Sequence, residues 1–209
     1  MQKTPQNILL FLGLLFCGVN FAQCDQHAIS RPVIVFDLHG ILTKVQLWPM
    51  AKTIARTIWQ EPKLFLKLIN PRTFKSGDYI HYPRLRQVYN SHLPQENAWQ
   101  LLRELKAAGY PVYLFSNIAE TTFAEFSEQF PGYFAIFDGY QIVPDADPTL
   151  RKPNPAAYAA CKALIQQKHP HKPIYFVDDS SQNIAAATAT GFADATFTSI
   201  EKLQESIKL

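Results

Sequence analysis

Acidic side chains directly follow two apolar runs of this chain. Asp37 ends the run at 33–36, and the pair Asp178-Asp179 ends the run at 173–177. Moving an unpaired carboxylate into an apolar interior costs several kcal/mol, so such a group usually faces a cation, a dipole or a substrate. Two adjacent carboxylates also repel each other, and binding a divalent cation is the usual relief. The acidic residues therefore predict a metal site.

A hydroxyl group and a cation complete the set of reactive groups. Ser116 and Asn117 follow a third apolar run at 111–115, and Lys152 precedes Pro153. Each feature alone has a plain structural explanation, since serine and asparagine often cap helices and a loop lysine is usually solvated. Beside the carboxylates, however, a hydrogen-bond donor and a fixed cation are what transfer of an anionic phosphoryl group requires. The combination indicates a phosphate-handling, metal-dependent hydrolase.

The order of apolar and amphipathic segments predicts how these groups meet. We expect strands at 33–36, 111–115 and 173–177, shorter strands at 136–137, 141–143 and 195–197, and helices at 94–108, 121–130, 155–168, 182–189 and 200–207. Strands that alternate with helices form a parallel, doubly wound sheet. Such sheets bind ligands beyond the carboxyl ends of their strands, so Asp37, Ser116 and the Asp178-Asp179 pair should converge on one edge.

Charge is distributed unevenly along the chain. The 209 residues are 47% hydrophobic and 18% charged, which is typical of one globular domain with a modest insertion and excludes a disordered chain. Residues 44–92 hold nine basic and two acidic side chains, so this segment carries +7, whereas the whole chain carries +3 and the remainder −4. The segment is expected to be mostly helical, at 48–60, 62–69 and 82–91, and it interrupts the alternation of strands and helices.

The basic insertion favours an anionic ligand, because clustered charge raises the local concentration of counter-ions. A solvated basic face explains the same charge. Aromatic residues lie between the basic ones, so two further readings stay open: contact with an anionic membrane surface or with a single nucleic-acid strand. No recognised nucleic-acid module accompanies the charge, so we expect a small phosphorylated molecule as the substrate and no nucleic-acid partner.

The first 23 residues predict an export signal. Lys3 precedes an apolar run at 8–19, and cleavage is expected within 22–24. Twelve apolar residues are too few for a comfortable membrane span, which needs about 20. We expect an exported protein, periplasmic or secreted, that meets a membrane only if this segment stays uncleaved as an anchor. A disordered cytosolic extension is the third reading, and whether Cys24 and Cys161 pair is left open.

Four motifs, in order, resemble those of the haloacid dehalogenase-like hydrolase superfamily. They are Asp37-Leu38-His39-Gly40-Ile41-Leu42, Leu114-Phe115-Ser116-Asn117, Arg151-Lys152-Pro153-Asn154-Pro155 followed by Tyr158, and Phe176-Val177-Asp178-Asp179-Ser180 followed by Asn183 and Ile184. The resemblance implies an α/β fold, with a doubly wound parallel sheet built from 31–43 and 93–209. Residues 44–92 look like the small helical cap of one subclass. Within it the chain is most similar to the branch of sugar-phosphate phosphatases and dehalogenases.

The resemblance also implies a role for each reactive side chain. Asp37 would be the nucleophile that forms an aspartyl-phosphate. The groups around the transferring phosphoryl group would be Ser116, Asn117 and Lys152. The ligands of a Mg²⁺ ion would be the side chains of Asp37, Asp178 and Asp179 and the backbone carbonyl of His39. In the cap, Arg84 and its neighbours His81 and Tyr82 would contact the substrate. The expected enzyme is a Mg²⁺-dependent phosphomonoester hydrolase.

His39 stands where phosphatases of this superfamily usually carry a second aspartate as general acid and base. His39 can itself be the acid, if a bound phosphate dianion raises its pKa above roughly 6.5. Alternatively, the leaving group needs no proton, or the loss of an acid worth roughly 10²–10⁴-fold has weakened catalysis. The alternatives to a phosphatase are therefore a metal-independent dehalogenase-type hydrolase and a catalytically weakened phosphate-binding protein.

Overall fold

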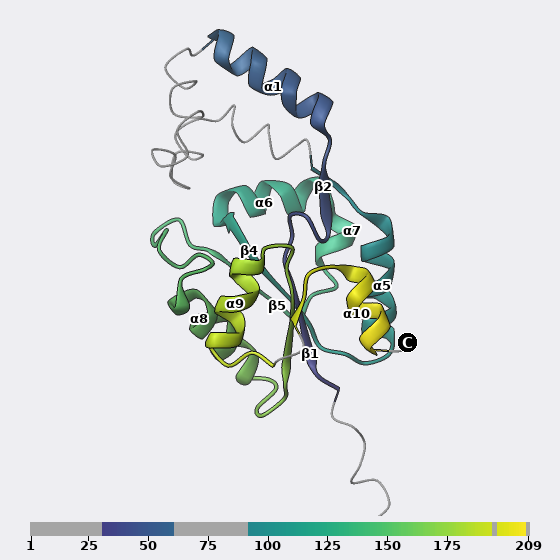
Figure 1. The fold of residues 1–209 in the computed structure, drawn as a ribbon. Helices are drawn as coiled ribbons and strands as arrows, with labels where there is room; N and C mark the ends of the chain where they lie inside the picture. Colours follow the sequence, from purple (N-terminus) through teal and green to yellow (C-terminus); the bar gives the residue numbers. More distant parts are fainter. Residues whose placement is uncertain (1–30, 61–91, 194–195, 208–209) are drawn as a thin grey trace, which may run out of the picture. The chain divides into compact units, whose positions relative to one another are not determined.

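A five-stranded parallel sheet lies at the centre of the structure (Figure 1). The computed structural model describes residues 31–60, 92–193 and 196–207, and the chain from Arg31 onward forms one unit. The strands are β1 (Val33–Phe36), β4 (Val112–Ala119), β5 (Gly139–Val143), β6 (Ile174–Val177) and β7 (Thr196–Phe197). Their order is β5-β4-β1-β6-β7, and every pairing is parallel. The predicted doubly wound parallel sheet is confirmed.

Helices cover both faces of this sheet (Figure 1). One face carries α8 (Pro155–Gln166) and α9 (Ser181–Ala189), and the other carries α5 (Glu96–Ala107) and α10 (Ile200–Ile207). The helices α6 (Glu120–Gln129) and α7 (Pro131–Phe134) contribute to the same apolar cluster as α5. The result is a three-layered α/β domain.

The apolar run of β1 explains these two layers of core. Val33 and Val35 belong to the cluster under α8 and α9, whereas Ile34 and Phe36 belong to the cluster under α5 and α10. All four side chains have no exposed surface. Burying each contributes about 1.5–3 kcal/mol, and apolar residues on both faces are what a central parallel strand requires. This burial fixes where β1 ends, and hence where Asp37 lies.

The insertion after β1 begins and ends in a two-stranded stem. β2 (Thr43–Val45) pairs antiparallel with β3 (His92–Pro94), and α1 (Leu47–Gln60) follows β2. The sequence did not predict the stem, but α1 matches the predicted helix at 48–60. Residues 61–91 lie outside the described residues. The helices expected there, the cap boundaries at 44–92 and the substrate contacts of Arg84, His81 and Tyr82 therefore stay predictions.

Two predicted elements differ from the structure. β4 runs to Ala119, with a shift of register between Phe115 and Ala119, so Ser116 and Asn117 lie within the strand and not after it. The prediction of a strand at 136–137 was wrong. These residues form the turn between α7 and β5. Phe137 packs against the Trp99 ring, at 5.8 Å between ring centroids, which explains an apolar residue in a turn.

The predicted export signal lies among residues 1–30, outside the described part of the chain. Export, cleavage and the state of Cys24 therefore stay predictions. Cys161 is described: it has no exposed surface, and burial raises the pKa of its thiol to about 12. A thiol held in this way is a core side chain and a poor partner for oxidation.

Candidate active site

Neighbouring strands bring the predicted reactive groups to one edge of the sheet. Phe36 of β1 pairs with Val177 of β6, and the next residues of the two strands are Asp37 and Asp178. The Asp37 N–H donates to the Val177 carbonyl over 2.8 Å. On the other side of β1, β4 carries Ser116 two residues beyond the position that pairs with Phe36. The convergence expected from the sequence is therefore present for β1, β4 and β6.

Lys152 joins the two strand ends from the loop before α8. Its ammonium group lies 2.9 Å from Asp37 Oδ1 and 2.5 Å from Asp178 Oδ2. Lys152 is 2% exposed, and its ammonium also lies 5.2 Å from the ring centroids of Phe115 and Phe176. A buried ammonium requires such partners because its desolvation is costly. Lys152 is thus a cation held at a fixed point between two carboxylates.

Asp178 uses both carboxylate oxygens to hold this arrangement. Oδ1 accepts from the Ser180 N–H at 2.9 Å and from the Asn183 side chain at 3.0 Å. Oδ2 accepts from Asn183 at 3.0 Å and from Lys152 at 2.5 Å. A carboxylate offers about four acceptor positions, so Asp178 is nearly saturated. Its main effect is to orient Lys152.

Asp179 lies against the backbone of the loop that follows Asp37. A Cβ atom placed on Gly40 would be only 2.1 Å from Asp179 Oδ2, and Gly40 has φ +86°. Glycine alone fits both the backbone angle and this close approach. Unlike Asp37 and Asp178, the Asp179 side chain is exposed. Gly40 therefore leaves the space in which the Asp179 carboxylate stands.

The three carboxylates fit a hard divalent cation. One oxygen each of Asp37, Asp178 and Asp179 lies within 4.8 Å of the other two. When all three are ionised, three negative charges and the Lys152 ammonium leave a net charge of −2. Mg²⁺ prefers oxygen ligands of this kind, and its charge matches this excess. The predicted metal residues are thus brought together, except that no contact of the His39 carbonyl tests its predicted role.

Electrostatics at the site reflect burial and mutual repulsion. The pKa of Asp37 is raised from 3.8 to about 6, first by burial and then by the charge of Asp178, while Lys152 opposes the shift. The Asp179 side chain is exposed but loses part of its hydration, and this desolvation, followed by the charge of Asp178, raises its pKa. Ionising these carboxylates together is therefore unfavourable in the protein alone. A cation bound between them would relieve that cost.

Ser116 and Asn117 have different surroundings. Ser116 is 1% exposed, and its Oγ accepts from the Ile118 N–H at 3.3 Å, which leaves its O–H able to donate. Asn117, predicted to bind substrate, holds the main chain of Lys152. It accepts from the Lys152 N–H at 2.6 Å and donates to the Lys152 carbonyl at 2.9 Å. Both ends of the Asn117 amide therefore help to position Lys152, and its contact with a substrate stays a prediction.

His39 packs edge-on against His92 of β3, with 4.5 Å between ring centroids. Burial, then the charge of His92 and then that of Lys152 lower the pKa of His39 to about 3. The imidazole is therefore neutral near pH 7 in the protein without substrate. The expectation of a protonated His39 requires a bound phosphate dianion that outweighs all three effects.

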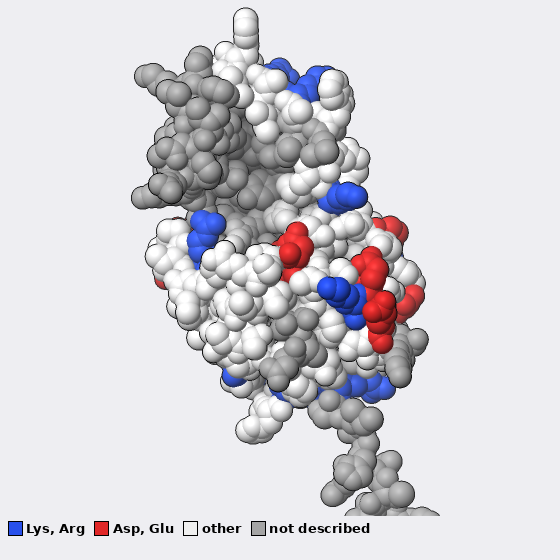
Figure 2. All heavy atoms as spheres, viewed as in Figure 1, with Lys and Arg blue, Asp and Glu red and all other residues white. Residues whose placement is uncertain are grey.

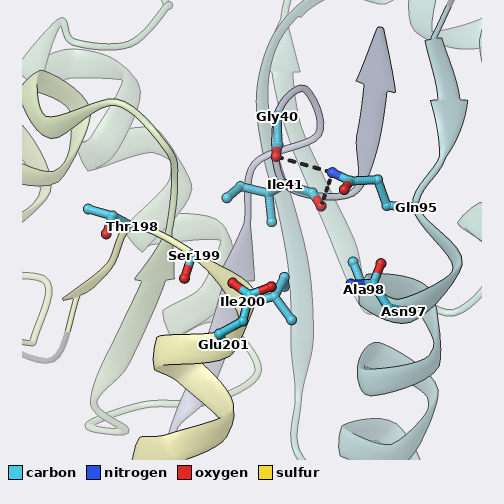
Figure 3. A pocket seen from close by; sticks show the side chains of 9 residues that line it. All are labelled: Gly40, Ile41, Gln95, Asn97, Ala98, Thr198, Ser199, Ile200 and Glu201. Carbon is cyan, nitrogen blue, oxygen red and sulfur yellow. Dashed lines mark hydrogen bonds between the residues drawn. The ribbon is translucent and has the colours of Figure 1, made fainter. Parts of the chain in front are cut away.

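Gln95, just before α5, is a site residue that sequence reasoning missed. Its side chain donates to the carbonyls of Gly40 at 3.2 Å and Ile41 at 3.0 Å (Figure 3). Its backbone N–H donates to the Leu42 carbonyl at 2.9 Å. These bonds attach the loop after Asp37 to the start of α5. The only signal in the sequence was its place at the start of a predicted helix, where glutamine has no distinctive meaning.

A small pocket of about 80 Å³ lies beside this contact, between the first residues of α5 and α10 (Figure 3). Gly40, Gln95, Ser199 and Glu201 are among the residues that line it. Asp37, Ser116, Lys152, Asp178 and Asp179 are not among the residues that line it, so the pocket adjoins the loop after Asp37 without containing the reactive groups.

Comparison with known proteins identifies the family of this chain. A family model described as haloacid dehalogenase-like hydrolase matches residues 32–191. A sesquiterpene phosphatase, astK, of Aspergillus oryzae is 28% identical over 171 residues, which cover 75% of this chain and 85% of that protein.

Several solved structures have a fold similar to that of this chain. A HAD family enzyme of Bacteroides thetaiotaomicron aligns with a TM-score of 0.61 and 17% identity, covering 85% of this chain and 98% of that one. The same enzyme in complex with magnesium and inorganic phosphate gives a TM-score of 0.57 at 18% identity, covering 80% and 93%. The L-2-haloacid dehalogenase RSc1362 gives 0.59 at 18% identity, covering 86% and 100%. With the family model matching most of its length, the chain belongs to the haloacid dehalogenase-like hydrolases.

Proposed function

We propose that this hydrolase is a Mg²⁺-dependent phosphomonoesterase that works through an aspartyl-phosphate on Asp37. One observation supports the proposal most: a single buried ammonium, Lys152, bonds both Asp37 and Asp178 beside a third carboxylate, Asp179. Displacing a halide has little need for clustered carboxylates. Moving a phosphate dianion toward an anionic nucleophile does need fixed positive charge on both sides.

In the proposed reaction, a carboxylate oxygen of Asp37 attacks phosphorus and the P–O bond to the leaving alcohol breaks. Lys152 offsets the charge of Asp37 and of the phosphate, and Ser116 can donate its hydroxyl hydrogen to a phosphoryl oxygen. Water then attacks phosphorus, the bond to Asp37 breaks, and inorganic phosphate leaves with the carboxylate restored. The catalytic groups are thus Asp37, Ser116 and Lys152, while Asn117 positions the lysine.

Asp37 and Asp179 are the carboxylates that we expect to hold Mg²⁺ directly. Asp178 contributes its charge, but its oxygens already accept bonds from Lys152, Ser180 and Asn183. When bound, the ion supplies positive charge that reduces repulsion between nucleophile and phosphate.

His39 is the group that we propose to serve the leaving alcohol. In the free protein its pKa of about 3 makes it a neutral imidazole, so it can donate a proton only after substrate binding raises that pKa. A leaving group that needs no proton would bypass the requirement. The ratio of kcat for an alkyl phosphate to kcat for p-nitrophenyl phosphate measures this dependence. His39→Ala should lower the ratio by roughly 10²-fold or more, whereas an unchanged ratio would remove His39 from the reaction.

The substrate is proposed to be a small phosphate monoester. The relative from Aspergillus oryzae is named a sesquiterpene phosphatase, which supports including phosphorylated sesquiterpenes with sugar phosphates in a substrate panel. We also propose an exported location, on the N-terminal sequence alone.

Phosphate release from p-nitrophenyl phosphate, with and without EDTA, tests the proposal. We expect activity that EDTA abolishes, Mg²⁺ restores and Asp37→Asn eliminates. Asp147→Asn is a matched control, because this carboxylate accepts hydrogen bonds from Thr149 of its own loop, and it should leave activity unchanged. Halide release insensitive to EDTA would indicate the dehalogenase alternative, and phosphate binding without turnover would indicate a binding protein.

A further inference from the structure

Helix α1 exposes two tryptophan side chains to solvent. Trp48 is 80% exposed and Trp59 is 87% exposed, whereas Trp99 in the core is 1% exposed. Tryptophan is usually buried over most of its surface. Two nearly complete indole rings in water are an apolar surface that calls for a partner.

The two rings lie on the same side of α1. They are eleven residues apart, which is close to three helical turns. Ala51 and Ala55 lie between them on that side, and both are exposed. Ile54 and Ile58, which are half-buried, continue the apolar side away from the tryptophans. Half of the helix circumference is therefore apolar. The two indole rings lie along one margin of this half, one near each end of the helix.

Basic side chains border this apolar half. Lys52 and Arg56 are exposed and follow Trp48 by one and two turns. Leu47–Gln60 contains no acidic residue. Figure 2 shows Lys and Arg atoms without an Asp or Glu atom beside them where Figure 1 draws α1. The surrounding segment 44–92 carries +7. The face defined by Trp48, Lys52, Arg56 and Trp59, called the α1 face below, is thus both apolar and basic.

We propose that the α1 face docks on an anionic membrane surface, with the helix lying in the plane of the headgroups. An apolar half, a basic border and indole rings are the combination that holds a helix in this plane. Indole rings favour the membrane–water interface, because they combine apolar area with one N–H donor. This contact is additional to the one expected from an uncleaved N-terminal segment.

The length of the helix fits a helix that lies on the bilayer. Fourteen residues extend about 21 Å, against about 30 Å for the hydrocarbon core. Among the described helices, none combines the length and the apolar character that crossing a bilayer requires.

Charge and spacing favour the membrane over two other occupants. In a symmetric dimer through this face, Lys52 and Arg56 would approach the same pair of basic residues on the second copy, and the like charges would repel. On a nucleic-acid strand, successive bases stack on neighbouring rings, but eleven residues separate the two indoles by about 16 Å along the helix. A flat anionic surface meets both rings and both charges at once.

Tryptophan fluorescence of the full chain tests the proposal directly. The chain has three tryptophans and none in the first 30 residues, so an N-terminal anchor cannot change the emission by its own insertion. Trp99 is buried and should not respond. The vesicles are phosphatidylcholine with about 30% phosphatidylglycerol, which gives a negative surface potential. On them we expect the tryptophan emission to shift to shorter wavelength and to be protected from quenching by acrylamide. Trp48→Phe and Trp59→Phe should each remove part of the shift.

Charge variants test the basic border. Each basic residue near an anionic surface contributes about fivefold to partitioning. The double variant Lys52→Gln, Arg56→Gln should therefore raise the lipid concentration that gives half of the emission shift by roughly 30-fold. Lys202→Gln, an exposed lysine on α10, is the matched control and should change nothing. Retained Trp99 emission and circular dichroism in each variant would show that it is folded.

Four results would overturn the proposal. They are no shift on anionic vesicles, an equal shift on pure phosphatidylcholine, a shift that the double charge variant retains, and a shift without vesicles. An emission shift without vesicles that grows with protein concentration would indicate a second copy as the partner. A shift that appears on adding a single-stranded oligonucleotide would indicate a nucleic acid.

Discussion

Gly40→Ala is the substitution that most sharply probes the relation between the nucleophile loop and the metal site. Its Cβ atom would lie 2.1 Å from Asp179 Oδ2, where ordinary contact begins near 3.4 Å. The carboxylate would therefore have to retreat by more than 1 Å. Asp179 is exposed, so we expect its side chain to rotate toward solvent and the protein to remain folded.

The expected cost separates into two parts. The φ of +86° at Gly40 disfavours an alanine by about 1–2 kcal/mol, which lowers the melting temperature by roughly 2–8 °C in a domain of this size. A retreat of more than 1 Å also exceeds the tolerance of about 0.2 Å in metal–ligand distances. Magnesium affinity should therefore fall by about 10–100-fold, the range typical when a metal ligand loses its support.

Gly109→Ala is the matched control for the backbone cost. Gly109 has φ +80°, but its Cβ would lie 3.8 Å from Arg31 Nη1, an ordinary contact and the nearest among the described residues. It should lose similar stability with no change in the Mg²⁺ concentration that gives half-maximal activity. The double variant Gly40→Ala, Asp179→Ala should show no further loss of affinity beyond Asp179→Ala alone. The reasoning would be refuted if Gly40→Ala and Gly109→Ala shifted the Mg²⁺ dependence equally.

Three further substitutions test the surrounding contacts. The raised pKa of Asp37, from 3.8 to about 6, means that this carboxyl favours folding below about pH 4 and loses that contribution as pH rises through 6. Asp37→Asn should therefore melt at a higher temperature than the parent in EDTA at pH 7, with the gap closing by pH 4; an unchanged gap would contradict the shift. Asn117→Ala removes two hydrogen bonds to Lys152 and should cost about 2 kcal/mol of unfolding free energy in urea, whereas a pure substrate ligand would raise KM and leave stability unchanged. Gln95→Leu should lower kcat because the Gly40 carbonyl loses its donor; Gln100→Leu, within α5, is its control, and equal kcat in both would refute the role.

The positions of the main acidic groups could be predicted because the length of an apolar run fixes where a buried strand ends. Val33–Phe36 is buried on both faces, so Asp37 had to emerge at the edge of the sheet. The same holds for Asp178 after β6, which neighbours β1. Local sequence was sufficient here, because hydrophobic burial determines both ends of these strands.

The roles that sequence could not supply depend on contacts between distant residues. Asn117 bonds Lys152 across 35 positions, and Gln95 bonds Gly40 across 55. Local composition cannot indicate which of several polar atoms such a side chain will reach. The extension of β4 through Ser116 was missed for a similar reason, because Ala119 pairs with Val143 of β5 beyond a shift of register and so continues the strand past its polar residues.

Trapping the covalent intermediate tests the central claim most directly. The protein is mixed with p-nitrophenyl phosphate and Mg²⁺, quenched in acid and reduced with borohydride, which converts an aspartyl-phosphate to homoserine; mass spectrometry then locates the change. We expect homoserine at position 37, dependent on Mg²⁺ and absent from Asp179→Ala. Continued phosphate release with an unmodified Asp37 would contradict the account.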